Sequence, residues 1–399
     1  MARWSASGTA LLPASGLLPA NVNTLTDPSP AAGLNCYLLV VMGPSTPIGT
    51  SDLLCAIPGT KSASGGPRLF TIQLNESNAA SFTWVEPLSG GQDGYLLQPS
   101  TGTAVTLPAT TTTTAYVING TTCFALVATA RGSAMGNSDV LCALPGLARL
   151  PPPAPGPYGL GARLSARLGI ATINPFTTGR PLLPGFTSGR VDLSPQVPPI
   201  GDQGQQGSCT GWAVGYYYKS YQEVVENRWN AADHRFSPSF VYNQCNGGED
   251  GGCVLDDAFR VVRDVGELES SEFPYDQGDY RRQPTADQRQ RAAPYRAARF
   301  GLISSGGGTP SVDDLRQWVG QGDVAVVAVA VDWNNRGWST TGIIDVPAPG
   351  ENTRANHAIA IVGFDDSEQR FKFANSWGTG WGQSGYGYLT YNMARRGSN

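Results

Sequence analysis

The sequence predicts a multidomain chain, in which an all-β part precedes a larger part that combines helices and strands. Residues 1–146 hold only ten of the charged side chains, and the other 48 fall in the remaining 253 of the 399 residues. The first part is rich in Gly, Thr, Ser, Pro and Ala and contains an internal repeat, whereas the second has amphipathic stretches. The length suits two or three domains, and the shift in composition marks a boundary between two kinds of domain.

Composition excludes several classes of function. The net charge of −4 argues against a general nucleic-acid-binding protein, because such proteins need basic faces to displace phosphate counterions. The longest apolar runs, Leu38–Met42 and Val324–Val331, are far shorter than the roughly 20 residues that span a bilayer. Residues Met1–Ala20 carry one Arg and are interrupted by Ser, Gly and Pro, so they make a poor secretion signal. Either the chain is cytoplasmic or its natural beginning lies upstream.

The first part contains two copies of one unit, offset by 87 residues. Residues 36–41 and 51–59 recur with substitutions as residues 123–128 and 138–146. Alternating apolar positions, the run Thr110–Thr114 and frequent Gly and Pro predict short antiparallel strands.

These copies resemble a fibronectin type III sandwich, with a period of about 90 residues, Trp84 in an early strand and Tyr95 in a middle one. The resemblance implies one such repeat over residues 60–146 and a partial one over residues 1–59. The counterpart of Trp84 in the first copy would fall before the first residue, so we expect the natural protein to extend upstream. Such modules are ordinarily spacers or surface scaffolds. The alternative is a receptor for a carbohydrate or protein, such as a cell-surface or matrix ligand.

Seven cysteines form three pairs and leave one residue over. Each repeat copy places two cysteines 19 residues apart, which favours the disulfides Cys36–Cys55 and Cys123–Cys142 in an oxidising compartment. Ordinary buried thiols are the alternative. Cys245 and Cys253 could close a local loop, and Cys209 is left over. No metal site is expected, because the chain has two His and no CxxC motif.

The chemistry of the second part centres on Cys209, which directly precedes a helical pattern that continues through Tyr216–Val225. A cysteine at a helix N-terminus faces partial positive charge, which favours the thiolate and lowers its pKa. His357 follows 148 residues later at the start of a predicted buried strand, and Asn375 comes 18 residues after it. Taken alone, a leftover cysteine is more often structural than catalytic, and a histidine in such a strand is usually a core residue. Asn375 can accept a hydrogen bond from the imidazole, and an adjacent indole can shield that bond from water.

Together these residues resemble the papain family of cysteine peptidases over residues 191–399. The resemblance makes Cys209 the nucleophile, His357 the general base and acid, and Asn375 the residue that orients the imidazole. Trp377 matches the indole that covers the Asn–His hydrogen bond. The implied fold is an α+β catalytic domain of two lobes, one helical and one β-rich, with an extended peptide held in the groove between them.

The reaction that the resemblance implies is acyl transfer through a thioester, with no metal ion and no organic cofactor. Gln203 matches the glutamine that donates to the oxyanion, beside the backbone N–H of Cys209. Gln205 and Gln206 compete for this role, but their spacing fits less well. The partner is therefore a protein or peptide substrate.

Further residues match the family's substrate-binding positions. Gly251 and Gly252 resemble the glycine shelf that pairs with the substrate backbone, in a register uncertain by one residue. Asn356 matches a position that borders the main specificity pocket, and Trp377 also contributes to substrate binding.

The sequence departs from the family pattern next to the nucleophile. Thr210 follows Cys209 where the family usually has Trp, and Trp212 comes two residues later. Gln206 stands where relatives have a second cysteine, so that disulfide cannot form. No helical inhibitory prodomain and no His-bearing insertion that would restrict access to chain ends are recognisable.

We therefore expect a secreted or cell-surface endopeptidase, and the scarcity of Lys, three of 27 basic residues, suggests a bacterial source. One alternative is a transpeptidase or cell-wall amidase that uses the same triad. The other is a surface-binding protein whose peptidase domain is inactive.

Residues 147–190 connect the two parts, beginning with the stiff Pro-rich segment Pro151–Pro157. The rest of this connector has too many apolar residues for a solvated tether, so we expect part of it to pack on the peptidase domain. It would act there as a docking segment or as a blocking strap. The apolar residues are Leu160, Leu164, Leu168, Ile170, Ile173, Phe176, Leu182, Leu183 and Phe186.

Overall fold

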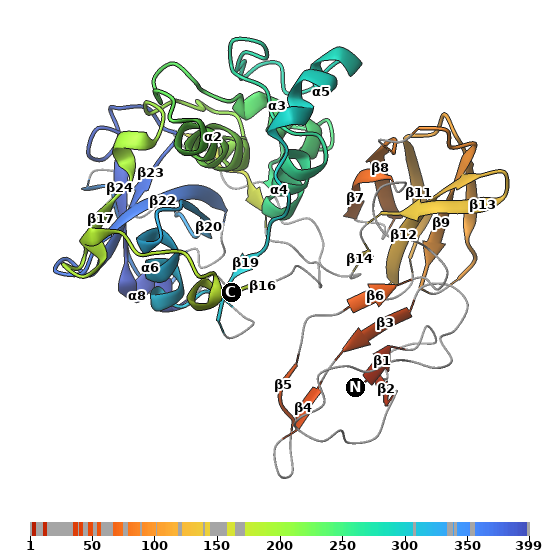
Figure 1. Cartoon of the computed structure of the whole chain (residues 1–399), viewed down its shortest axis with the longest axis horizontal. Helices are drawn as coiled ribbons and strands as arrows, with labels where there is room; N and C mark the ends of the chain where they lie inside the picture. Colours follow the sequence, from red (N-terminus) through yellow and green to blue (C-terminus); the bar gives the residue numbers. More distant parts are fainter. Residues whose placement is uncertain are drawn as a thin grey trace. The chain divides into compact units, whose positions relative to one another are not determined.

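The chain forms two compact units in the computed structural model (Figure 1). The first comprises Met1–Leu150 and Ala166–Ala171, and the second comprises Pro151–Ser165 and Thr172–Asn399. For the strands before residue 57 the structure describes the backbone only. The described residues are 2–4, 11–13, 35–38, 40–42, 47–50, 54–56, 67–74, 79–87, 90–100, 102–118, 122–138, 140–143, 158–163, 172–305, 309–332, 338, 341–351 and 356–396.

Two antiparallel sheets make up the later half of the first unit. Their strands are β7 (Arg68–Leu74), β8 (Ala79–Val85), β9 (Gly94–Pro99), β10 (Val105–Pro108), β11 (Thr113–Val117), β12 (Thr122–Ala130), β13 (Ser133–Asn137) and β14 (Leu141–Ala143). One sheet has the order β11-β8-β7, and the other has the order β10-β9-β12-β13, with β14 also paired to β12. Alternate residues of β8, β9 and β12 fill a common core, in which Trp84 meets Tyr95 edge to face at 5.4 Å between ring centroids.

The two copies of the sequence repeat pair their strands in the same register. The earlier strands are β1 (Ala2–Trp4), β2 (Leu11–Pro13), β3 (Asn35–Leu38), β4 (Val40–Met42), β5 (Pro47–Thr50) and β6 (Leu54–Ala56). In the pair β3–β6, Cys36 lies opposite Cys55, and in the pair β12–β14, Cys123 lies opposite Cys142. Cys123 is disulfide-bonded, while the side chains of the other three cysteines lie outside the described part of the chain.

The second unit has a helical lobe built around the cysteine-bearing helix. Its elements are α1 (Cys209–Gly211), which continues through the π-helical turn η4 (Trp212–Lys219) into α2 (Ser220–Asn227), then α3 (Pro238–Cys245), α4 (Leu255–Asp264), α5 (Ala286–Ala292) and the short turn η5 (Ala293–Tyr295). Helix α3 begins after Ser237, because the Ser237 hydroxyl accepts from the Phe240 N–H and Pro238 occupies the first helical position.

The other lobe is a six-stranded sheet with helices beside it (Figure 1). Its elements are β17 (Arg190–Asp192), β20 (Ala325–Val329), β21 (Ile343–Ile344), β22 (His357–Asp365), β23 (Arg370–Ala374), β24 (Tyr386–Thr390), α6 (Val312–Gly320) and α8 (Tyr391–Arg396). Strand β22 is buried along almost its whole length, since it pairs with β17, β20 and β23 and packs on both faces. The predicted buried strand at His357 is therefore correct.

The described parts of the connector, residues 158–163 and 172–190, belong to the second unit. Their elements are β15 (Ala162–Arg163), paired in parallel with β18 (Cys253–Val254), and β16 (Thr172–Ile173), paired in parallel with β19 (Leu302–Ile303). Three short turns follow, η1 (Pro175–Thr177), η2 (Pro184–Phe186) and η3 (Ser194–Gln196).

The apolar residues of the connector do not all behave as expected. Leu160 is buried, and Ile173 and Phe186 pack against the core of the unit. Phe176 is 53% exposed, contrary to the expectation, and Leu182 and Leu183 are also exposed, although their side chains lie beside Gly320 and Gly322. Leu164, Leu168 and Ile170 lie outside the described residues. Within the described ranges, no helix is both long and apolar enough to cross a bilayer.

Candidate active site

Cys209 is the first residue of α1, as the sequence predicts. Ser208 precedes it, and the Trp212 N–H donates to the Ser208 carbonyl at 3.1 Å, which closes the first helical turn. The Cys209 side chain is 0% exposed and packs with Ala162, Ala213 and Ala358. It is the single free cysteine among the residues whose side chains are described.

His357 and Asn375 meet at one end of the sheet, because β22 begins at His357 and its antiparallel neighbour β23 ends just before Asn375. His357 Nε2 and Asn375 Oδ1 are 2.8 Å apart. The Trp377 ring stacks on the imidazole with centroids 4.2 Å apart and covers this bond from solvent. His357 Nδ1 has no hydrogen-bond partner among the described residues, and Cys209 packs against the neighbouring Ala358. The structure thus brings together three residues that the sequence selected.

Gln203 is fully buried beside this pair, and its amide is held in a fixed orientation. The Ser376 hydroxyl donates to Gln203 Oε1 at 2.5 Å, and the Gln203 N–H donates to the Ser376 carbonyl at 2.8 Å. Gln203 Nε2 is therefore free to donate elsewhere, and it donates to the carbonyls of Gly159 at 3.0 Å and Gln206 at 2.8 Å. The sequence analysis missed Ser376, although its position between Asn375 and Trp377 could have indicated it.

Gln205 and Gln206, the other candidates for the oxyanion donor, have different surroundings. The Gln206 side chain donates to the backbone carbonyls of Asp276 and Gln277, and Gln205 is exposed. Trp212, displaced along the helix relative to the family pattern, packs against Gly201, where a Cβ atom would come within 2.1 Å of the indole. These side chains support the loop that carries Gln203.

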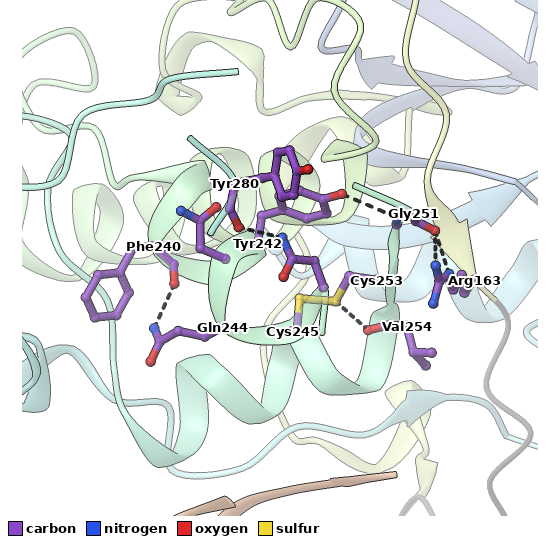
Figure 2. The surroundings of a disulfide bond; sticks show 12 residues. Arg163, Phe240, Tyr242, Gln244, Cys245, Gly251, Cys253, Val254 and Tyr280 are labelled. Atoms are coloured by element: carbon purple, nitrogen blue, oxygen red, sulfur yellow. Dashed lines mark hydrogen bonds between the residues drawn. A yellow bond between two sulfur atoms is a disulfide. The ribbon is translucent and has the colours of Figure 1, made fainter. Parts of the chain in front are cut away.

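The glycine pair lies at the end of a disulfide-linked loop (Figure 2). Cys245 and Cys253 form a disulfide across a sequence separation of eight, which places Gly251 and Gly252 beside helix α3. Gly252 adopts a positive φ of 91°, a conformation that favours glycine. The Arg163 guanidinium donates to the Gly251 carbonyl, with the Nε contact at 2.6 Å.

Asn356 uses its side chain to hold the neighbouring strand. Its amide accepts from the Val331 N–H at 2.9 Å and donates to the Val331 carbonyl at 2.8 Å. The Asn356 backbone carbonyl faces the site instead, where it accepts from the Ala162 N–H at 3.0 Å.

The described connector segment 158–163 contacts several of these residues, in an arrangement that the sequence did not indicate. The Tyr158 ring stacks on Trp377 with a centroid distance of 5.0 Å and an angle of 10° between the planes. Gly159 accepts from Gln203, and the Gly161 carbonyl accepts from the Cys253 N–H at 2.9 Å. Ala162 follows against Cys209.

Burial has the largest effect on the pKa values of Cys209 and His357. It raises the pKa of the Cys209 thiol to about 11, although backbone hydrogen bonds from Ala358, Gly161, Ala162 and Thr210 oppose that rise. Burial also lowers the pKa of His357 to about 4, against the hydrogen bond from Asn375, which raises it. The prediction of a lowered thiol pKa is therefore wrong for this state, because loss of solvent outweighs the helix N-terminus. Burial thus favours the uncharged form of each group.

The comparisons with known proteins identify the class of this domain. Residues 188–398 match the family model described as papain family cysteine protease, so the chain belongs to the papain family. It is 26% identical over 238 residues to a peptidase C1-like protein of Acanthamoeba polyphaga mimivirus, which covers 55% of this chain and 75% of the viral protein.

Two further matches are a cathepsin and a solved cysteine protease structure. The chain is 26% identical over 213 residues to cathepsin L of Sarcophaga peregrina, covering 50% of this chain and 56% of that protein. Among solved structures it is similar to xylellain, a cysteine protease from Xylella fastidiosa, with 20% identity and a TM-score of 0.49 over 62% of this chain and 94% of that one. The papain-family match over residues 188–398 defines a cysteine peptidase domain, and the chain spans little more than half the length of this cathepsin L.

No group of three or more His, Cys, Asp or Glu side chains that could hold a metal ion occurs among the described residues.

Proposed function

We propose that this chain hydrolyses peptide bonds, with Cys209 as the nucleophile, His357 as the general base and acid, and Asn375 as the residue that orients the imidazole. The observation that carries this proposal is the buried hydrogen bond between His357 and Asn375 under Trp377, beside a cysteine at a helix N-terminus. The bond to Nε2 leaves Nδ1 for the proton of the thiol.

The reaction would proceed in two halves. The Cys209 sulfur attacks the carbonyl carbon of the scissile peptide, and His357 transfers the thiol proton to the leaving amine, so that a thioester forms as the C–N bond breaks. His357 then takes a proton from water, which attacks the thioester and releases the acid and the thiol. Gln203 Nε2 and the Cys209 N–H would hold the oxyanion in both halves, a role worth ~2.7–4 kcal/mol per donor.

The substrate would be an extended polypeptide whose backbone pairs with the shelf formed by Gly251 and Gly252. The Asn356 carbonyl and the Trp377 ring would line the same groove, and the chain would cut within polypeptides. The backbone pairing of Gly161 and Ala162 with Cys253, next to these glycines, supports this part of the proposal.

The test is turnover of a fluorogenic peptide together with labelling by a peptidyl epoxide that alkylates the active-site thiol. Cys209→Ala should abolish both turnover and labelling while the fold is retained, and His357→Ala should be equally severe. Asn375→Ala should be milder, because nucleophile and base remain. Residual turnover within about tenfold of the unmodified chain after Cys209→Ala would contradict the assignment.

Product analysis separates this proposal from a transpeptidase or cell-wall amidase that uses the same residues. Hydrolysis predicts the free acid even when an amine nucleophile is added, whereas a transpeptidase would give mainly the amide. A surface-binding protein with an inactive domain would give neither product and no labelling.

For the first unit we propose fibronectin type III-like modules that space the peptidase from a surface or matrix ligand. The strand orders β11-β8-β7 and β10-β9-β12-β13 and the contact of Trp84 with Tyr95 support this. The disulfide Cys245–Cys253 and the bonded state of Cys123 support a location outside the cytoplasm.

A further inference from the structure

A cavity of about 570 Å³ lies beside the loop that carries Gln203, and it is called the side cavity. One wall is formed by the residues on either side of Gln203, and the other by the loop that follows Phe273. The Tyr275 hydroxyl joins the two walls, since it donates to the Gln203 carbonyl at 2.8 Å. The lining includes Asp202, Gly204, Tyr275, Asp276, Gln277 and Arg282.

Two exposed carboxylates give the lining negative charge. Asp202 Oδ1 accepts from the Gly204 N–H at 2.8 Å, and Asp276 Oδ1 accepts from the Gly278 N–H at 2.8 Å. The second oxygen of each carboxylate has no hydrogen-bond partner among the described residues. Both aspartates can therefore accept from a group that enters the cavity.

Arg282 is the one basic residue among the described residues that line the cavity, and its own contacts hold it. Its guanidinium lies 3.9 Å from the centroid of the Phe273 ring, and Nη2 donates to the Pro274 carbonyl at 2.9 Å. Its Nε lies 4.0 Å from the Asp279 carboxylate. Arg282 forms no ion pair with Asp202 or Asp276, so the negative charge of the lining remains available.

The side cavity lies at the end of the groove toward which the leaving part of a substrate runs. Connector residues 158–163 contact Trp377 at one end and the glycine shelf at the other, with Cys209 between them. His357, the proposed proton donor to the leaving amine, stacks beneath Trp377. Asp202 pairs with Trp377 through an isolated antiparallel β-bridge. A substrate whose acyl part lies on the shelf therefore sends its leaving part past Asp202.

A polypeptide backbone already passes the rim of the side cavity. The Gly159 N–H donates to the Gly204 carbonyl at 2.9 Å, next to the stacked rings of Tyr158 and Trp377. Since Gly204 lines the cavity, the side chain of a polypeptide bound at this end of the groove can enter it.

We propose that the side cavity binds a lysine or arginine side chain of the substrate, from one of the first three residues after the cleaved bond. This inference rests on the proposed peptidase function and adds a substrate preference to that same site. Asp202 and Asp276 select the side chain by its charge, while its methylene stem packs on Pro274 and Tyr275. Asp202 directly precedes Gln203, so the residues that pass it lie within about 10 Å of the cleaved bond, the span of three extended residues.

The experiment compares arginine with citrulline, which has a similar shape without the charge. Internally quenched peptides carry either residue at one of the first three positions after the cleaved bond, and kcat/KM is measured for each. The full-length chains compared are the unmodified protein, Asp202→Asn and Asp233→Asn. Asp202→Asn keeps a side-chain oxygen that can accept from the Gly204 N–H. Asp233, the control, is an exposed aspartate that does not line the cavity.

At one of the three positions the unmodified chain should cleave the arginine peptide with a kcat/KM about fivefold higher, the upper end of what an exposed ion pair contributes. Asp202→Asn should reduce this ratio to less than about twofold, and Asp276→Asn should reduce it in the same direction, whereas Asp233→Asn should keep it. A change in the ratio, and not only in the rate, measures the coupling between one carboxylate and one guanidinium.

Equal cleavage of the two peptides at all three positions would overturn the side cavity and leave the peptidase function standing. A ratio that Asp202→Asn leaves unchanged would do the same.

A binding measurement covers the case in which no peptide is cut. N-acetyl-arginine amide and N-acetyl-citrulline amide are titrated into the intact chain and followed by NMR. Binding of the arginine amide that is about fivefold tighter, and that Asp202→Asn abolishes, would support the side cavity and contradict the peptidase function. Equal binding of the two amides would overturn the side cavity as well.

Discussion

At the scale of single residues, burial affects the pKa of Cys209, the proposed nucleophile, more strongly than the surrounding hydrogen bonds do. The helix N-terminus and four backbone hydrogen bonds favour a Cys209 thiolate, yet burial keeps the thiol pKa near 11. His357 is affected in the opposite direction, because burial lowers its pKa to about 4. Opening the groove would admit water, lower the pKa of the thiol and raise that of the imidazole. The same two side chains can thus be inert or reactive according to what covers them.

Ser376 offers a prediction at this scale. Its hydroxyl fixes the amide of Gln203, so Ser376→Ala should lower kcat by about fivefold to thirtyfold, or ~1–2 kcal/mol, and leave KM nearly unchanged. The measurement is steady-state hydrolysis, with Ser188→Ala, an exposed serine, as the control.

The role of Ser376 as a positioning residue is tested by the double variant. If Ser376 acts through Gln203, Gln203→Ala combined with Ser376→Ala should be no slower than Gln203→Ala alone. Effects that multiply would show that Ser376 acts in another way.

At the scale of elements, the register of the paired strands indicates which cysteines can form disulfides. The pairs β3–β6 and β12–β14 place their cysteines directly opposite each other in both copies of the repeat. Cross-strand neighbours have their Cβ atoms close enough for a disulfide.

We therefore predict the disulfides Cys36–Cys55 and Cys123–Cys142. Mass spectrometry of non-reduced peptides from protein prepared under oxidising conditions should find both linked pairs. The control is the same digest after reduction, in which both should disappear. Free thiols at all four positions would refute the pairing and weaken the proposed location outside the cytoplasm.

The loop closed by Cys245 and Cys253 leads to a second prediction at this scale. The disulfide Cys245–Cys253 closes a loop with a sequence separation of eight, for which chain entropy gives a stabilisation of about 2–3 kcal/mol. Replacing both cysteines, Cys245→Ser with Cys253→Ser, should lower the free energy of unfolding by about that amount in urea denaturation. Because Gly251 and Gly252 directly precede Cys253, KM should rise more than kcat falls. If neither KM nor the sensitivity to urea rises, the disulfide does not order this loop.

At the scale of the whole molecule, a buried carboxyl group makes the free energy of unfolding depend on pH. Glu267 is fully buried in the helical lobe, and burial raises its pKa well above the ordinary value of 4.5. Lys219, the nearest opposite charge, lowers this pKa only in part and is itself paired with Glu223 at 2.5 Å. Gly215 packs against the carboxylate, and a Cβ atom there would come within 3.1 Å of it.

Glu267→Gln should therefore stabilise the protein at high pH. As pH rises through the ordinary value, the unfolded chain releases the Glu267 proton while the folded chain keeps it, so the free energy of unfolding falls. The amide cannot release a proton, so the variant should gain in melting temperature at pH 8 and gain less or nothing at pH 4. Glu226→Gln, an exposed site on α2, is the control. An equal change at both pH values would contradict the assignment.

The sequence by itself determined which residues are candidates for the chemistry. Cys209, His357, Asn375, Gln203 and Trp377 could be selected because they stand in the order and at the spacing that resemble the papain family. The buried strand at His357 and the helix that begins at Cys209 followed from local patterns of apolar residues, and the pairing of the cysteines followed from the internal repeat.

Only the tertiary structure decided what covers these groups. The composition of the connector indicated that it would pack, but not that Gly159 and Gly161 would place its backbone against the loop before Cys209, nor that Phe176 would stay exposed. The sign of the thiol pKa shift was wrong from sequence for the same reason. Solvent exposure and backbone contact depend on residues far apart in the chain, and no local pattern records which distant segment will fill a groove.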